Sequence, residues 1–281
     1  MNAMVKILLA VVSLLAAPAG PVFGDEGGPQ LAYVKFKCHG DIVAAHAHAM
    51  KVLKEAGYRV PAGQDDNASV AYGTLPLDSI APVLMAHVLC SIVKTGAKEF
   101  TNVTIVTSSI EPAKAKAERD KLHDLMKNGE KEVAGTVVQG ELASVTKADG
   151  KAGTPLVYAT DFHITYAGKM DNALKTTHRM LDEMDFNPAA LDLSHPPEVV
   201  AGSKLPDNIA ALAVVTSVED GGQIPVHLYL AVRYWAAKDA SHNDLVKAKN
   251  VAKTVAYQYL MDMIHIEGGD PGNSLKPTHP K

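Results

Sequence analysis

The feature that most constrains the fold is a helical segment that occurs twice in the chain. Gly40–Tyr58 and Gly168–Phe186 are equally long, and an extended run precedes each of them. Apolar residues recur in both at the spacing i, i+3, i+4, i+7, which is typical of an amphipathic helix with one buried face. Each segment begins at a glycine and ends at an aromatic residue. We therefore expect two helices in equivalent places of two related units.

Each of these helices lies within the same succession of elements. The preceding runs, Leu31–Cys38 and Pro155–Tyr166, are rich in residues that favour strands. Two apolar runs joined by a turn and then a second amphipathic segment follow in each half. They are Ala81–Val93, Phe100–Ser109 and Pro112–Lys127 in the first half, and Ile209–Val218, Pro225–Trp235 and Asn243–Ile266 in the second. Each half is thus predicted to be a β-α-β-β-α unit.

This pattern predicts an α+β fold, because such a unit buries one face of an antiparallel sheet under its helices. The layout is like ferredoxin-type half-domains in shape, and that analogy implies no function. We place the first unit at 25–130. The second, at 131–267, includes a linking hairpin formed by Thr136–Lys147 and Thr154–Tyr166.

Two long polar connections, Pro61–Pro76 and Asn187–Asp207, follow the repeated helices in equivalent places. Loops on one sheet edge could shape a binding surface, since binding residues concentrate on loops. The plainer interpretation is that they only carry the chain from helix to strand.

The N-terminal segment 1–24 has the composition of a secretory signal peptide. Lys6 precedes an apolar run at Ile7–Ala17 that is too short to span a bilayer, and small residues and prolines follow it. We expect cleavage to leave an exported chain, periplasmic or extracellular, without a membrane span. The Gly- and Pro-containing segment 268–281 is predicted to be a flexible tail.

Charge and composition restrict the partners of the exported chain. The formal net charge is −4, and the lysines are scattered among acidic residues without a basic block. This pattern argues against nucleic acid as a partner. Aromatic residues make up 5% of the chain, with one tryptophan, Trp235, which disfavours an aromatic platform for carbohydrate. A small ligand or another protein remains as the partner class.

The chain has two cysteines, Cys38 and Cys90. In an oxidising compartment, the first interpretation of such a pair is a disulfide. Two buried thiols or two soft metal ligands are the alternatives. Asn67 and Asn102 each begin an N-glycosylation sequon, which has meaning only in a eukaryotic source.

Metal-capable side chains are densest in the first unit. His39, His46 and His87 form the candidate metal set, with both cysteines close to them in sequence. Imidazole and thiolate suit copper or zinc. Packed or solvated histidines are the alternative, because the spacings match no known metal-site pattern.

A second group of candidate residues lies in the second unit. His163, His178 and His227 could face a shared cleft and serve acid–base chemistry, and Arg233 could bind an anionic ligand. Asp192, Ser194 and His195 are neighbours in a proline-rich loop, a place that rarely gives triad geometry. No catalytic, phosphate-binding or dinucleotide-binding motif is present, so we assign no catalytic residue.

These observations favour an exported binding or interaction module over an enzyme. Its ligand or partner would use the cleft or sheet face between the two units. A copper- or zinc-binding protein is the first alternative hypothesis. A hydrolase-like enzyme that uses histidine acid–base chemistry is the second.

Overall fold

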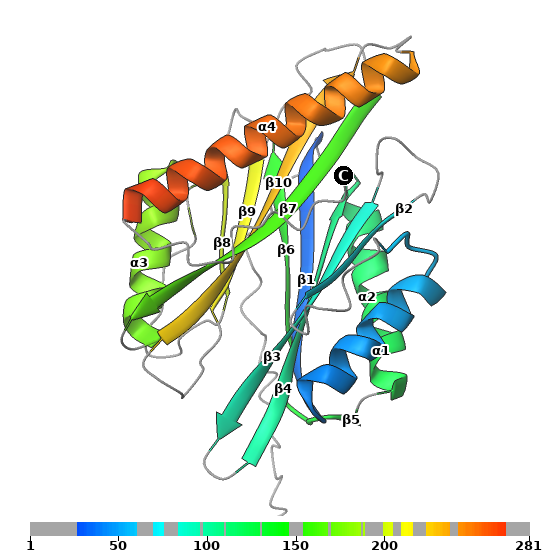
Figure 1. The fold of residues 1–281 in the computed structure, drawn as a ribbon, viewed down its shortest axis with the longest axis vertical. Coiled ribbons are helices and arrows are strands. Elements are labelled where there is room, and N and C mark those ends of the chain that lie inside the picture. Colours follow the sequence, from blue (N-terminus) through cyan, green and yellow to red (C-terminus); the bar gives the residue numbers. More distant parts are fainter. Residues whose placement is uncertain are drawn as a thin grey trace, which may run out of the picture.

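Two antiparallel sheets pack face to face in a computed structural model of the chain, and helices cover the outer face of each sheet (Figure 1). The expected α+β fold is thereby confirmed. The structure describes residues 27–60, 70–75, 84–95, 98–109, 111–129, 131–145, 154–167, 170–186, 188, 199–204, 209–215, 223–236 and 241–267. The predicted signal peptide at 1–24 and the predicted tail at 268–281 lie outside these residues. Within them, no helix is long and apolar enough to cross a membrane.

Sheet A comes from the first half of the chain. Its strands are β1 (Gly27–His39), β2 (Val70–Leu75), β3 (Leu84–Thr95), β4 (Lys98–Ser109), β5 (Lys131–Glu132) and β6 (Val138–Val145). They run in the order β2-β3-β4-β1, and both β6 and the short β5 pair with the remaining side of β1. Helices α1 (Ile42–Glu55) and α2 (Pro112–Gly129) cover the outer face.

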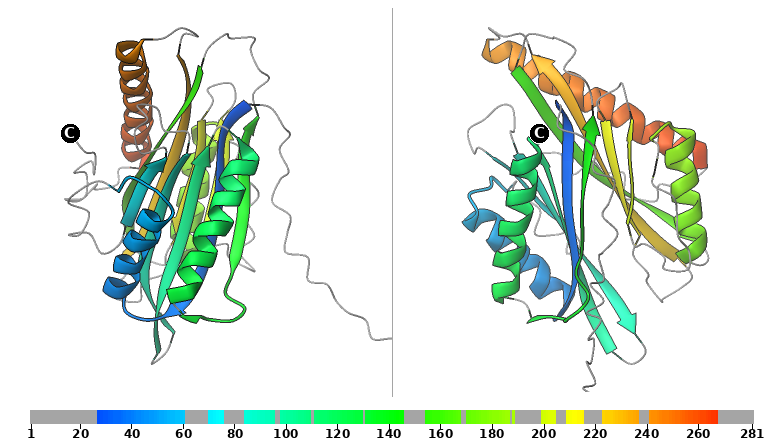
Figure 2. Two further views of the ribbon diagram at one scale, coloured as in Figure 1. Left: turned by 90° about the vertical axis from the view of Figure 1, so that its right-hand side faces the viewer. Right: turned by 180° about the vertical axis from the view of Figure 1, so that it is seen from behind.

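Sheet B comes from the second half. It contains β7 (Thr154–Ala167), β8 (Val199–Lys204), β9 (Ile209–Val215) and β10 (Gln223–Ala236), in the order β7-β10-β9-β8. Helices α3 (Met170–Glu183) and α4 (His242–Glu267) cover its outer face. In the right-hand view of Figure 2, α1 and α2 lie to the left of the sheets, and α3 and the C-terminal part of α4 lie to the right.

The two halves have the same element order and the same strand order. Each half reads β-α-β-β-β-α, and in each the first strand lies beside the last. The predicted unit therefore lacked one strand. The missing strands, β2 and β8, lie within the segments Pro61–Pro76 and Asn187–Asp207 that the sequence presented as polar connections. Both are short edge strands interrupted by a glycine, and such strands carry a weak sequence signal.

The predicted linking hairpin is wrong. β6 pairs with β1 in sheet A, whereas β7 pairs with β10 in sheet B. The alternation of Thr136–Lys147 and Thr154–Tyr166 correctly indicated strands. It could not show that the chain passes from one sheet to the other between them, because neighbouring strands pair only about two-thirds of the time.

The first helix of each half ends in the same way. Gly57 has φ = 90° after α1, and Asp185 has φ = 61° after α3. The next residue then donates its N–H back into the helix, from Tyr58 to the Leu53 carbonyl at 2.9 Å and from Phe186 to the Leu181 carbonyl at 2.8 Å. This is the Schellman arrangement, in which a left-handed residue ends the helix. Both aromatic rings are buried under their own helices.

Three apolar layers hold the molecule together. One lies between sheet A and its helices, and includes Val34, Phe36 and Cys38. A second lies between sheet B and its helices. The third lies between the two sheets and contains residues of β1, β3, β4, β7 and β10. Because alternate residues of a strand face opposite sides, the odd-numbered residues of β1 face sheet B and the even-numbered ones face the helices.

Candidate functional site

The face of sheet A that meets sheet B is apolar at one end. At this end, residues of the adjacent strands β1, β4 and β3 pack on residues of β7 and β10. The residues of both sheets that form this contact are Leu31, Met85, Leu89, Val106, Ala159, Tyr229 and Ala231. The two sheets also make a polar contact, since the N–H of Ala159 donates to Met85 Sδ at 3.2 Å. This end of the interface is an ordinary packed core.

The same face becomes polar further along β1 and β4. Lys35 is opposite Thr104, and Lys37 is opposite Asn102, so strand alternation puts all four on the face toward sheet B. Facing residues of paired strands have Cβ atoms about 4.5–5.5 Å apart. Lys35, Asn102 and Thr104 are buried, while Lys37 is half-buried. We call these four residues the Lys35 cluster.

Lys35 is the chemically unusual member of the cluster. Its side chain is only 3% exposed. Burial penalises the ammonium form, and the nearby Lys37 charge adds repulsion; together they lower the pKa of Lys35 to about 7. Lys35 therefore loses its proton more readily than an exposed lysine does.

Asn102 adds a buried acceptor to the cluster. The residue is 2% exposed, and among the described residues its Oδ1 atom has no hydrogen-bond partner. A buried acceptor of this kind is costly unless a donor reaches it. The same burial makes the Asn102 sequon inaccessible to glycosylation in the folded protein. The other sequon, at Asn67, lies outside the described residues.

His87 lies on the same face of sheet A. It is on β3, directly opposite Val106 of β4. Its ring packs edge-on against the Tyr229 ring of sheet B, with centroids 5.5 Å apart. The ring is buried. His87 and Tyr229 thus extend the set of polar side chains between the sheets.

The predicted metal ligands do not come together. His39 is exposed at the end of β1, where its ring lies 5.3 Å from that of Phe100. His46 lies on α1, over the outer face of sheet A, whereas His87 points into the interface with sheet B. Sheet A therefore stands between His46 and His87. Within the described part of the chain, no group of three His, Cys, Asp or Glu residues could hold a metal ion.

The cysteine pair lies on two strands separated by a third. Cys38 is on β1 and Cys90 is on β3, with β4 between them, and they face Thr101 and Val103 respectively. Two strand spacings amount to about 9.6 Å, more than the Cα separation of about 4.4–6.8 Å that a disulfide spans. Both residues are buried thiols in the structure, so its geometry disfavours the expected disulfide.

The second histidine group is brought together in part. His163 and His227 are directly opposite each other in the register of β7 and β10. His178 is on α3, over the outer face of sheet B, and is half-buried there. Arg233 is opposite Val157. The side chains of His163, His227 and Arg233 lie outside the described part of the structure.

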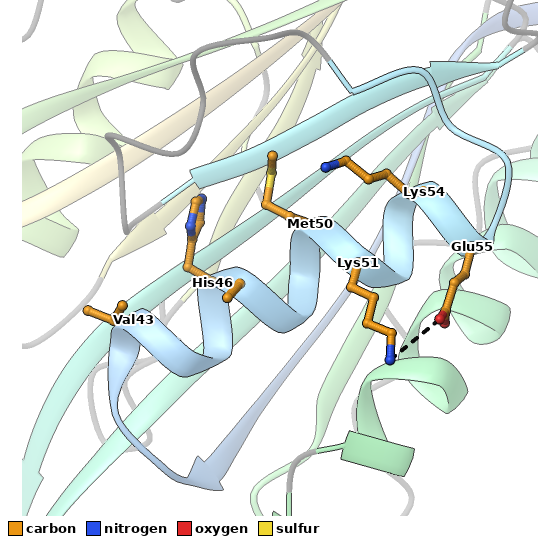
Figure 3. A pocket seen from close by; sticks show the side chains of 7 residues that line it. Val43, His46, Met50, Lys51, Lys54 and Glu55 are labelled. Atoms are coloured by element: carbon orange, nitrogen blue, oxygen red, sulfur yellow. Dashed lines mark ion pairs between the residues drawn. The ribbon is translucent and has the colours of Figure 1, made fainter.

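A groove of about 450 Å³ runs along α1 (Figure 3). His46 and Met50 project into it from one side of the helix, as their four-residue spacing predicts. Lys51 and Glu55 point to the other side and form an ion pair of 3.6 Å. The described residues that line this groove all belong to α1, and Val43 at its end is 65% exposed.

The sequence did not point to the Lys35 cluster. Alternation in Leu31–Cys38 puts the lysines on one face of the strand, and a lysine-bearing face normally points to solvent. Sequence reasoning also missed a partly buried ion-pair candidate on the outer face, where His123 Nε2 lies 2.8 Å from Glu132 Oε2 and the imidazole packs on Phe36. Neither set has a local sequence motif. The Lys35 cluster arises from strand pairing between distant segments, whereas His123 of α2 meets Glu132 of the next element, β5.

Comparison with known proteins adds no family. No protein-family model matches the chain, and no curated protein matches it. Among solved structures, a protein of unknown function from Galdieria sulphuraria aligns with 10% identity over 87% of this chain and 96% of its own, at a TM-score of 0.21. The di-domain ARO/CYC StfQ from the steffimycin biosynthetic pathway aligns with 10% identity over 84% and 96%, at a TM-score of 0.24. Alignments of this quality carry no inference about this chain.

Proposed function

We propose that this protein is an exported binding protein that holds a small polar ligand between its two sheets, at the Lys35 cluster. The observation that carries this proposal is the buried Oδ1 of Asn102, which has no hydrogen-bond partner among the described residues. A buried acceptor needs a donor, and a bound ligand or an ordered water would supply it. The position agrees with the sheet face between the units that the sequence suggested for a binding module.

The neighbours of Asn102 support a ligand more than a structural water. A binding site combines a mostly apolar wall with a few convergent polar groups. Here Leu89 of β3 lies opposite Thr104, and the Lys35 and Lys37 amines lie one strand further on the same face. Such a site would favour a ligand with a hydrogen-bond donor for Asn102 and polar groups for the rest of the cluster.

Native mass spectrometry of the secreted, purified chain tests this proposal. We expect a bound mass that disappears on denaturation. Asn102→Leu should abolish it, because the variant removes the acceptor and leaves a side chain of similar size. Ser108→Ala is the matched control, since Ser108 is also buried on this face of β4 and its Oγ also has no hydrogen-bond partner among the described residues.

The control separates ligand binding from general damage to the interface. Ser108→Ala should retain the bound mass. An empty wild-type protein, or an Asn102→Leu protein that retains the mass at the wild-type level, would refute a site at the Lys35 cluster. The metal-binding and hydrolase-like hypotheses gain no support from the positions of their residues among those described.

A further inference from the structure

Strand β7 forms one edge of sheet B, and it is the longest edge strand among those described (Figure 1). It spans 14 residues, whereas β2 and β8 span 6 residues each and β6 spans 8. Proteins usually protect an edge by keeping it short or by placing proline or lysine in it. The part of β7 at 160–167 contains neither residue, and β10 is the only described strand that pairs with β7. Such an edge is a template for another strand.

The backbone groups along β7 alternate in direction. In an antiparallel pair, every second residue directs both its N–H and its C=O away from the paired strand. The N–H of Ala159 donates to Met85 Sδ of sheet A at 3.2 Å, so Ala159 directs its polar groups away from β10. The register of β7 and β10 is continuous, and the odd-numbered residues of 160–167 therefore direct theirs the same way. Pro225, which is opposite Thr165 and has no N–H, agrees with this assignment.

The first half of the chain shows what covers the equivalent edge. β1 holds the place in sheet A that β7 holds in sheet B, and the side of β1 away from β4 pairs with β6 and the short β5. Both of these strands follow α2, so the corresponding segment of the second half is 268–281, which follows α4. Its prolines at 271, 277 and 280 lack the N–H that a paired strand donates. The sequence of this segment therefore disfavours a strand like β6.

We propose that the outer edge of β7 pairs with the same edge of a second copy of this chain, so that the two four-stranded sheets join into one continuous sheet. The two strands run antiparallel about a twofold axis, and a single contact satisfies the edges of both copies. Odd-numbered residues of 160–167 face odd-numbered residues of the other copy, because these residues direct their N–H and C=O groups outward. The dimer does not depend on the ligand proposed above.

Sedimentation velocity of the full secreted chain over a wide range of concentrations measures the oligomeric state. We expect a dimer whose population increases with concentration. Thr165→Pro removes one outward N–H from each copy, so it should weaken the dimer by about tenfold or more. An edge strand tolerates proline where the N–H points out of the sheet, so the variant should keep the wild-type circular dichroism and Trp235 fluorescence. Thr165→Ala is the matched control, because it retains the N–H, and it should dimerise as the wild type does.

Hydrogen exchange read at single residues identifies the pairing strand in the wild-type protein. The odd-numbered amides of 160–167 should gain protection of about tenfold or more as the dimer forms. The even-numbered amides, which point toward β10, should be protected at every concentration. A dimer with unprotected odd-numbered amides, or one that Thr165→Pro forms as strongly as the wild type, would overturn pairing through β7. A monomer at all concentrations would also overturn it, and protected odd-numbered amides in that monomer would show that a segment of the same chain covers the edge.

Discussion

At the scale of the residue, Lys35 lowers the stability of the folded protein in a manner that depends on pH. Its pKa is lowered from 10.5 to about 7, so between these values the unfolded chain binds more protons than the folded one. The resulting loss in the free energy of unfolding is at its full value below about pH 7 and disappears as the pH rises toward 10.5. We expect the change in the free energy of unfolding caused by Lys35→Met to be more favourable near pH 6.5 than near pH 9.5 by about 3 kcal/mol.

Urea denaturation of the ligand-free variant and wild type at both pH values measures this difference. Lys54→Met is the control, because its side chain is exposed and its removal should change stability equally at the two pH values. A Lys35→Met effect that is the same at pH 6.5 and 9.5 would contradict a lysine held in an unfavourable environment.

The Lys35 cluster shows what a single strand can and cannot reveal. The alternation of Leu31–Cys38 correctly predicted a strand, and it correctly separated Lys35 and Lys37 from Val34 and Phe36. The lysine-bearing face is nevertheless covered by a second sheet, which the local pattern does not encode.

The candidate histidines were chosen because imidazole binds metals, but burial and register decide which side chains meet. His46 and His87 lie on opposite sides of sheet A for this reason.

At the scale of the element, the repeated helix end allows a matched pair of substitutions. Gly57 and Asp185 occupy equivalent left-handed positions after α1 and α3. Glycine adopts this conformation without strain, whereas a residue with a Cβ atom costs about 1–2 kcal/mol there, and somewhat less when it is Asp. We expect Asp185→Gly to raise the free energy of unfolding by about 0.5–1 kcal/mol, and Gly57→Asp to lower it by about 1 kcal/mol.

Urea denaturation of the two single variants measures both signs. The prediction fails if both substitutions change stability in the same direction, because the two positions would then not be conformational equivalents. Thermal melts monitored at 222 nm provide an independent check, since both changes act at the ends of helices.

Long elements were predicted well, whereas the six-residue strands β2 and β8 were missed. The four helices and the strands β3, β4, β7 and β10 match the predicted segments closely at their ends. Their sequences are long enough for periodicity to accumulate. β2 and β8 span six residues each, so they contain too few alternations to stand out from the polar segments around them.

At the scale of the whole molecule, the shared layer between the sheets couples the two halves. Leu31, Leu89 and Val106 of sheet A are buried only because sheet B covers them, and Tyr229 and Ala231 of sheet B depend in turn on sheet A. Unfolding of either half would expose this layer on the other. We therefore expect one cooperative transition, in which both halves unfold together.

The chain carries one intrinsic probe for each half. Trp235, the only tryptophan, lies on β10 and reports the second half by its fluorescence. Cys38 and Cys90 are buried under the helices of sheet A and report the first half by their reaction with a thiol reagent in brief pulses. We expect both probes to give the same urea midpoint, with no reaction of the native protein and two reactive thiols per unfolded chain.

Thiol exposure well below the fluorescence midpoint would show that the first half unfolds alone. A fully unfolded chain without reactive thiols would establish the disulfide that the strand register disfavours, so the same experiment tests the coupling of the halves and the state of the cysteines.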